Sequence, residues 1–206
     1  MAGPAKERTH HAVHAMDFGT WPDLFVVDVE GNGASPPDLI EVAALPIRDG
    51  RPDTSTAGAW LIRPPRPVTP RAAHVHGLTN DRLSAAPQWR AVSGEVHAML
   101  STAWICAHNA HTDYRVLSAH LPEWQPAGVL DTLRLAKATH PGLSGYSLDA
   151  LTTHLAPDLT AAPATGRHRA TYDACATAQL LITMAAHYET WDQLISAAVP
   201  PALPGA

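Results

Sequence analysis

Two acidic side chains close an apolar segment near the start of the chain. Asp28 and Glu30 lie at the end of the run Leu24–Val29, and residues two apart point to the same face of a strand. Carboxylates in such a place are costly unless they are paired or bind a metal ion. Gly31 and Gly33 follow and leave room for a ligand. The pair predicts a cation site, with a solvated strand end as the alternative.

A second pair of polar residues follows the short apolar segment Ala103–Ala107. Asn109 and Asp113 are four residues apart, so one helical turn brings them to a common face. Asp113 lies near the N-terminus of the helix expected there, where the helix dipole favours a carboxylate. A plain helix cap is the alternative interpretation of this pair.

A histidine and an acid precede the last long helical pattern. His168 follows Gly166 in a segment that we expect to be a mobile loop, and Asp173 opens the helix. A first-turn acid beside a surface histidine is the alternative interpretation.

The elements that carry these residues begin with strands. Apolar segments predict strands over residues 24–29, 39–47 and 57–62, and Asp49-Gly50 predicts a tight turn between the last two. These segments therefore form an antiparallel meander of three strands.

The rest of the chain alternates between helix and strand. Short buried strands are expected at 103–107 and 128–130. Apolar spacing and caps predict helices at 89–100, from about 112 to 121, at 132–139, from Ser147 to 154, and from about 171 to 188. The sequence thus predicts one α/β domain with a mixed five-stranded sheet, three antiparallel strands and then parallel βα units, flanked by helices.

Taken together, the motifs resemble the DEDDh 3′→5′ exonuclease family, which is DnaQ-like. Asp-x-Glu lies on the first strand, Asn-x-x-x-Asp after the fourth, and His-x-x-x-x-Asp before the last helix. Segments 75–79, 130–135 and 146–151 are also similar to that family, and the resemblance covers roughly residues 24–187. It implies a ribonuclease-H-like fold, in agreement with the pattern of strands and helices.

The resemblance also implies the chemistry. The protein would hydrolyse phosphodiester bonds at the 3′ end of single-stranded DNA, RNA or short oligonucleotides and release nucleoside 5′-monophosphates. Asp28 would bridge two Mg²⁺ or Mn²⁺ ions, Glu30 and Asp173 would complete one site, and Asp113 would support the other. Oxygen ligands select these hard ions, and His168 would be the general base, since an imidazole can take up and release a proton near neutral pH.

Substrate-binding residues follow from the same resemblance. Gly31 and Asn32 would offer backbone N–H groups, and His76 and Leu78 would contact the terminal base as wedge and wall. Core packing is the alternative for Leu78. Arg167 and Arg169 flank His168 and could steer phosphate, with exposed loop arginines as the alternative. The full expected set is Gly31, Asn32, His76, Leu78, Asn109 and Arg167.

Two positions depart from the family pattern. Thr112 stands where an aromatic residue often precedes the acid, which puts base stacking there in doubt. Gly31 stands where a threonine often follows the first glutamate, which loosens the expected pocket.

Composition limits the other possibilities. Hydrophobic residues make up 46% of the 206 residues, and charged residues 16%, as in a folded domain. No apolar run approaches the ~20 residues of a membrane span, and two cysteines exclude a disulfide scaffold. The net charge of −5 argues against an extended coat for duplex DNA and favours a local groove.

The expected organisation has three parts. Residues 1–20 form a flexible N-terminal arm with His10, His11 and His14, residues 21–195 form the exonuclease domain, and residues 196–206 form a Pro-rich, frayed tail. We expect a cytoplasmic protein with no membrane partner, and a homodimer is one possible assembly.

Two other functions compete with catalysis. The same fold could serve as a non-catalytic module that binds nucleic-acid ends. Residues 63–70 contain spaced prolines and could form a polyproline II ligand. The segment could equally be a rigid connection, or its arginines Arg63, Arg66 and Arg71 could contact the substrate backbone.

Overall fold

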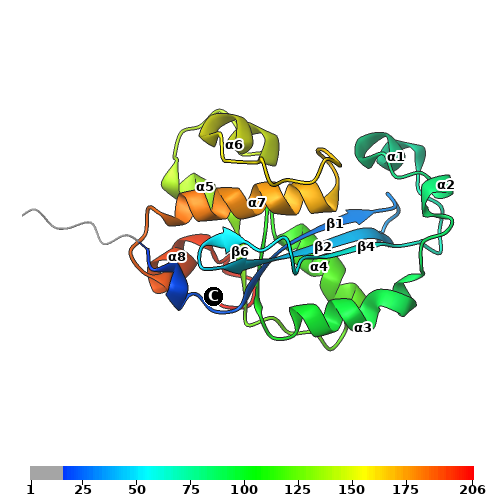
Figure 1. Ribbon diagram of the computed structural model, residues 1–206, viewed down its shortest axis with the longest axis horizontal. Coiled ribbons are helices and arrows are strands. Elements are labelled where there is room, and N and C mark those ends of the chain that lie inside the picture. The colour runs from blue at the N-terminus through cyan, green and yellow to red at the C-terminus, as the bar shows by residue number, and fades with distance from the viewer. Residues whose placement is uncertain (1–15) are drawn as a thin grey trace, which may run out of the picture.

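A mixed sheet with helices on both faces forms the body of the molecule (Figure 1). The computed structural model describes residues 16–206. Within them the strand order is β3-β2-β1-β5-β6, with β4 also paired to β2. The strands are β1 (Leu24–Gly31), β2 (Leu39–Arg48), β3 (Arg51–Pro52), β4 (Gly58–Leu61), β5 (Trp104–Ala107) and β6 (Gly128–Asp131).

The first three strands are antiparallel, and β1, β5 and β6 are parallel, which confirms the predicted topology. The sheet has one strand more than predicted, because the returning chain pairs with β2 twice. Asp49 and Gly50 both have positive φ, 48° and 70°, as a type I′ turn requires, and they bring Arg51 opposite Arg48. The chain then leaves the edge and returns as β4, so the sheet remains five positions wide.

The helices flank this sheet. Those predicted from apolar spacing are all present, and Asp131 and Ser147 cap their helices as expected. Three helices were not predicted, the first, second and last of the set α1 (Pro70–His76), α2 (Asn80–Leu83), α3 (Trp89–Leu100), α4 (His111–His120), α5 (Thr132–Thr139), α6 (Leu148–Leu155), α7 (Ala170–Ala185) and α8 (Trp191–Ala198).

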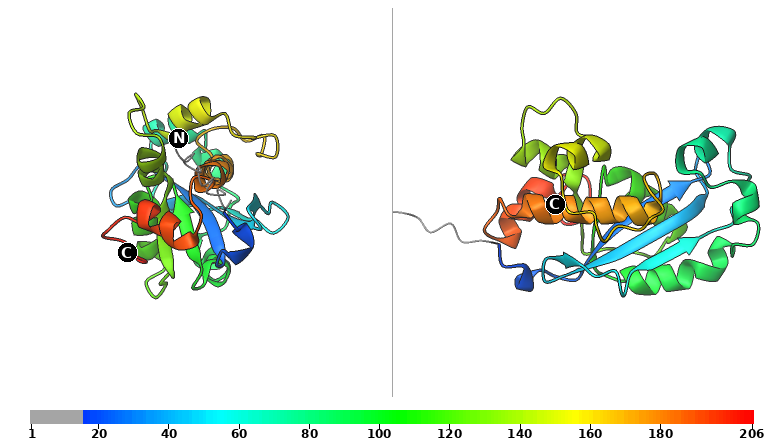
Figure 2. Two further views of the ribbon diagram at one scale, coloured as in Figure 1. Left: turned by 90° about the vertical axis from the view of Figure 1, so that its left-hand side faces the viewer. Right: turned by 45° about the horizontal axis from the view of Figure 1, so that its top comes forward.

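The core lies on both faces of the sheet. Val26 points into the cluster under α5 to α8, and Val27 points into the cluster over α3 and α4. A third, smaller cluster lies under α1 and α2. Figure 2 shows α7 lying along one face, while α1 and α2 cover one end of the sheet. Residues of even number in β1 therefore face α7, which sets the direction of Asp28 and Glu30.

The predicted domain boundaries differ from the described structure at both ends. The C-terminal segment is packed, because Leu203 is buried and the Val129 N–H donates to the Pro204 carbonyl. The boundary at 195 falls within α8. At the other end, Met16 is buried and Phe18–Thr20 form a 3-10 helix. The rest of the arm, with its three histidines, lies outside the described residues.

Among residues 16–206, no helix combines the length and the apolar character that crossing a membrane requires.

Candidate active site

Three carboxylates meet where β1 ends and α7 begins; Figure 1 shows the positions of these two elements. Asp28 and Glu30 face α7 from β1, and Asp173 lies in the first turn of α7. One oxygen from each of these carboxylates lies within 4.8 Å of the others. The sheet and one helix thus bring together acids that are more than 140 residues apart in the chain.

Asp113 approaches the same place from α4, on the other face of the sheet. It is 5% exposed, and its Oδ1 accepts a hydrogen bond of 3.1 Å from the Val29 N–H. It lies outside the cluster of three, yet its charge raises the pKa of Asp28 more than any other neighbour does. The structure therefore brings all four acids predicted from the sequence to one region, with Asp113 next to the cluster of three but not part of it.

Burial and mutual repulsion make these carboxyl groups hard to ionise. Burial is the largest cause in each case, and it raises the pKa of Glu30 to about 8, of Asp113 to about 7 and of Asp173 to about 6. The pKa of Asp28 is raised well above its usual value by burial and by the charges of four acids, Asp113, Glu30, Asp173 and Glu41.

Such a group of acids needs protons or cations between its members. Carboxylate oxygens suit hard divalent ions such as Mg²⁺ and Mn²⁺. The residues present therefore fit a metal centre.

His168 stands beside the cluster on an exposed loop. Its φ of +59° is left-handed, a conformation that is uncommon for residues other than glycine. Its N–H donates to Asp173 Oδ2 at 3.1 Å. The main chain of His168 is thereby tied to one of the clustered acids, while its side chain faces solvent.

Two predicted substrate residues lie on or just after α1. His76 is buried, and its Nδ1 accepts the Leu78 N–H at 3.0 Å. Nε2 of His76 therefore carries the proton in the neutral ring, and it has no hydrogen-bond partner among the described residues. Leu78 packs with Ile40, Val68 and Leu83, so the alternative interpretation of Leu78 as a core residue is the one that the packing favours.

The polar groups of Asn32 form hydrogen bonds within the protein. Its N–H donates to the Asp38 carbonyl at 3.0 Å, and its side chain bonds Asp38 and the Arg66 carbonyl. The expected donation from its N–H to a substrate is not available in this arrangement. At Gly31, an added Cβ would lie 3.0 Å from Pro37 Cβ. This close approach explains the glycine where the family often has threonine.

The remaining predicted residues are exposed. Asn109 has a φ of +62°, and its N–H donates to Asp131 Oδ1 at 3.0 Å. Arg167 pairs with Asp149 at 3.2 Å, with the two side chains 52% and 45% exposed. Both side chains can reach solvent, and neither belongs to the carboxylate cluster.

One residue beside the cluster, Glu41, escaped the sequence analysis. Glu41 on β2 is 3% exposed and pairs with Arg169, which follows His168 directly. One signal was available, since Glu41 is the only acid within the apolar run 39–47. An isolated acid in a buried strand indicates a partner, but the sequence does not say which.

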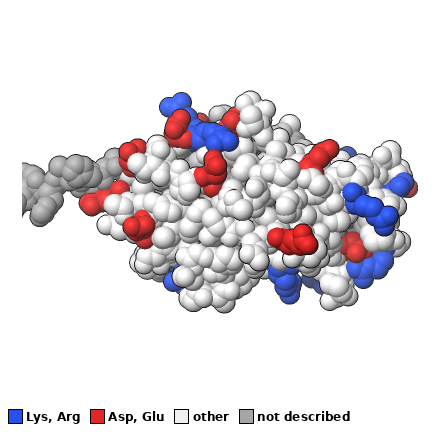
Figure 3. Space-filling model, turned by 90° about the horizontal axis from the view of Figure 1, so that it is seen from below, with Lys and Arg blue, Asp and Glu red and all other residues white. Residues whose placement is uncertain are grey.

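Basic side chains are unevenly spread. Figure 3 shows one group of them at the upper left of one face and several at its right-hand end, which is the end formed by α1 to α3 in Figure 1. Segment 63–90 supplies five arginines and one acid there, although the whole chain has a net charge of −5. β1 points its carboxylate-bearing end toward the same part of the molecule.

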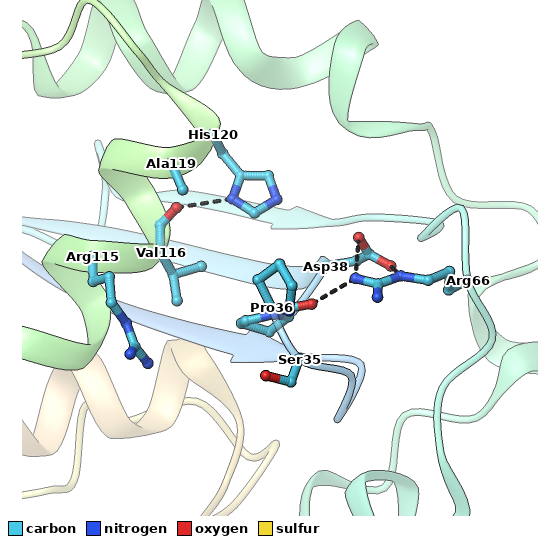
Figure 4. A pocket seen from close by; sticks show the side chains of 9 residues that line it. Ser35, Pro36, Asp38, Arg66, Arg115, Val116, Ala119 and His120 are labelled. Carbon is cyan, nitrogen blue, oxygen red and sulfur yellow. Dashed lines mark hydrogen bonds and ion pairs between the residues drawn. The ribbon is translucent and has the colours of Figure 1, made fainter.

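A groove of 460 Å³ opens between the β1–β2 connection and α4 (Figure 4). Arg66 on one wall bonds both oxygens of Asp38, at 2.8 and 3.0 Å, and the Pro36 carbonyl at 2.6 Å. Arg115 on the α4 wall forms no ion pair within residues 16–206. Arg66 therefore fastens segment 63–70 to the domain, as a rigid connection would, and Arg115 is free to meet a ligand.

Fold and site together define a class: an α/β enzyme in which a carboxylate cluster suited to divalent ions lies at the end of the central strand. Comparison with known families agrees, since residues 25–181 match the model of the RNase_T exonuclease family. The chain belongs to that exonuclease family. The resemblance to DEDDh, DnaQ-like 3′→5′ exonucleases is confirmed. The comparisons favour an enzyme over the alternative of a non-catalytic binding module.

Individual relatives support the assignment. The chain is 31% identical over 159 residues to exodeoxyribonuclease 10 of Escherichia coli K12, covering 77% of this chain and 67% of that protein. It is 30% identical over 165 residues to a DNA polymerase III subunit epsilon-like protein of Rhodobacter capsulatus, covering 77% of this chain but 23% of that one.

Solved structures agree as well. Exonuclease X in complex with 5′ overhanging duplex DNA superposes with a TM-score of 0.71 at 29% identity, covering 84% of this chain and 98% of that chain. Exonuclease I, at 18% identity and a TM-score of 0.66 over 79% of this chain and 40% of that chain, shows the shared fold. Nothing in these matches supports the homodimer considered from the sequence.

Proposed function

We propose that this exonuclease uses Asp28, Glu30, Asp113 and Asp173 to hold two Mg²⁺ or Mn²⁺ ions and His168 as its general base. The observation that carries the proposal is the convergence of three carboxylates within 4.8 Å, in a place where burial opposes their ionisation. When bound, such a pair of ions holds an attacking water and a leaving oxygen at one phosphorus.

The chain's own residues supply the proton transfer. His168 takes a proton from the water as the water oxygen attacks phosphorus, and the bond from phosphorus to the 3′-oxygen of the preceding nucleotide breaks. That oxygen takes a proton from solvent and becomes the new 3′-hydroxyl. The products are a nucleoside 5′-monophosphate and a strand shortened by one nucleotide. The N–H of His168 bonds Asp173, which keeps the base next to the reacting groups. The exposure of its ring lets the base reach the water without moving a buried segment.

The proposed substrate is the 3′ end of single-stranded DNA, RNA or a short oligonucleotide. The arginine-rich end of the molecule and the free guanidinium of Arg115 suit a phosphate backbone. His76 offers a proton on Nε2 that lacks a partner among the described residues, and Gly31, Asn109 and Arg167 complete the proposed contacts. The names of the similar proteins, an exodeoxyribonuclease and exonuclease X bound to DNA, favour DNA.

A direct test uses oligonucleotides labelled at the 5′ end, as matched DNA and RNA, with Mn²⁺, Mg²⁺ or a chelator. We expect a ladder that shortens from the 3′ end, 5′-monophosphates as products, and no reaction with the chelator. Asp173→Asn should lower kcat at least about 100-fold.

The matched control for Asp173→Asn is Asp158→Asn, which removes an exposed acid near the C-terminal end of α6. It should keep the wild-type rate. Intact oligonucleotides after incubation with folded protein and Mn²⁺, or label released as a mononucleotide from the 5′ end, would refute the proposal.

A further inference from the structure

Glu41 lies directly opposite Glu30 in the antiparallel pairing of β2 with β1. Directly opposite residues share a face of a sheet, so Glu41 faces α7 beside the clustered acids. Its charge raises the pKa of Asp28, Glu30 and Asp173. An acid in this place adds to the repulsion among the carboxylates, so we ask which favourable contacts Glu41 makes.

The partner of Glu41 is the start of α7. Arg169 donates from Nη2 to Glu41 Oε1 at 2.7 Å and from Nε to Oε2 at 2.9 Å. The N–H of Ala170, the first residue of α7, donates to Oε2 at 3.0 Å. Arg169 is the N-cap residue and makes no side-chain cap of its own. The carboxylate of Glu41, from another element, takes the place of that cap. Its negative charge also interacts favourably with the dipole at the N-terminus of α7.

The ion pair between Glu41 and Arg169 is buried, unlike the side-chain contacts on the other side of His168. The side chains of Glu41 and Arg169 are 3% and 16% exposed. The bonds on the other side of His168 are exposed, namely the Arg167–Asp149 pair and the hydroxyl contact of Thr165 with Thr171. Gly166, with a φ of +80°, leaves the chain free to turn there. The main chain beside His168 is therefore held mainly on its C-terminal side, by the bonds of Arg169 and Ala170 to Glu41.

We propose that the Glu41–Arg169 ion pair positions His168, because it fixes the main chain next to this residue relative to the carboxylates on β1. It links β2, whose neighbour β1 carries Asp28 and Glu30, to the peptide that follows His168. This inference rests on the proposed role of His168 as base. Neither residue of the pair needs to touch the substrate, so the pair acts through His168.

The decisive variant is Arg169→Lys, which keeps the charge but loses the planar fork that binds both oxygens. A displacement of the base by about 1 Å can cost on the order of 100-fold in rate. We expect kcat to fall about 10- to 100-fold, with KM for an oligonucleotide changed less than about 3-fold. Glu41→Gln should produce the same split, and both variants should retain cooperative thermal unfolding.

A double-variant cycle separates positioning from general support of the fold. If Arg169 acts through His168, Arg169→Lys should cost less than about 3-fold when it is added to His168→Ala. Arg48→Lys is the matched control, because Arg48 forms an exposed ion pair with Asp23 at 3.3 Å. This control should change kcat less than about 2-fold.

The cycle has clear contrary outcomes. An Arg169→Lys cost that is equally large in an impaired His168→Ala background overturns the inference alone. So does a raised KM with unchanged kcat. Wild-type kcat in His168→Ala itself removes the proposed base, and the inference falls with it.

Discussion

At the scale of single residues, the site is built from groups that repel one another. Asp28, Glu30, Asp113 and Asp173 all have raised pKa values, and burial is the first cause for each. The folded chain without ions therefore stores an unfavourable charge distribution. Divalent cations relieve it, so the same residues that weaken the metal-free protein create affinity for metal.

We expect the metal-free protein to lose stability as the pH rises from about 5 to about 8. The unfolded chain releases these protons near pH 4, whereas the folded pKa values are about 6, 7 and 8 for Asp173, Asp113 and Glu30. Between these limits the folded state binds more protons, so the free energy of unfolding falls with pH. A fall of several kcal/mol should appear in denaturant unfolding with a chelator.

Two further measurements complete this prediction. Saturating Mn²⁺ should remove most of the pH dependence. Asp28→Asn should raise the free energy of unfolding of the metal-free protein at pH 8 while lowering kcat at least about 100-fold. Asp23→Asn, which removes an exposed acid, should change neither. A flat or rising stability between pH 5 and 8 would contradict the charge argument.

At the scale of elements, carboxylates at strand positions hold the starts of two helices. Glu41 of β2 caps α7. Asp131 at the end of β6 caps α5 through the Leu133 and Arg134 N–H groups, at 2.8 and 3.4 Å, and also accepts the Asn109 N–H at 3.0 Å. One carboxylate thereby joins β6, α5 and the turn before α4, which carries Asp113.

We expect Asp131→Ala to lower the free energy of unfolding by about 2–3 kcal/mol, because it removes a cap and leaves three partly buried N–H groups without this acceptor. Ser147→Ala is the matched comparison, since Ser147 caps α6 through one bond, from the Ala150 N–H, at an exposed site. Its cost should be about 0.5–1 kcal/mol. Equal losses in denaturant unfolding would show that the extra bond to Asn109 contributes nothing.

At the scale of the whole molecule, charge is polarised. The chain carries a net charge of −5, yet segment 63–90 has five arginines and one acid, and the end formed by α1 to α3 is basic (Figure 3). Of the arginines there, Arg63 bonds the Ser84 carbonyl and Arg66 bonds Asp38. These two hold the fold together. Arg71, exposed on α1, and Arg115 on α4 form no ion pair within residues 16–206.

We expect the double variant Arg71→Gln/Arg115→Gln to raise KM for a single-stranded oligonucleotide about 3- to 30-fold at constant kcat. If both side chains meet phosphates, the slope of log KM against log salt should fall by about 1.4, at about 0.7 per contact. Steady-state kinetics between 50 and 200 mM salt would measure it. Arg134→Gln/Lys137→Gln, which removes two cations from α5, is the charge-matched control. An equal effect of the control would indicate general charge attraction instead of a defined path.

Much of the architecture was predictable because its signals are local. Asp49-Gly50 predicted the turn that both positive φ values confirm, and Asp131 predicted the start of α5. The short helices α1 and α2 were not predicted, because packing on Ile40 and Val68 stabilises them more than their own spacing does. The Pro-rich end was expected to fray, yet Leu203 and Pro204 pack on the sheet.

The sequence by itself singled out the four acids that we propose as metal ligands, because the motifs that contain Asp28, Glu30, Asp113 and Asp173 resemble those of the exonuclease family in type and order. Only the tertiary structure decided which residues around them are free to act. It committed Asn32, Arg66 and Leu78 to the protein's own bonds and core, and it paired Glu41 with Arg169. The physical reason is that such partners lie up to 128 residues apart, and a contact between distant segments leaves no periodic pattern in either of them.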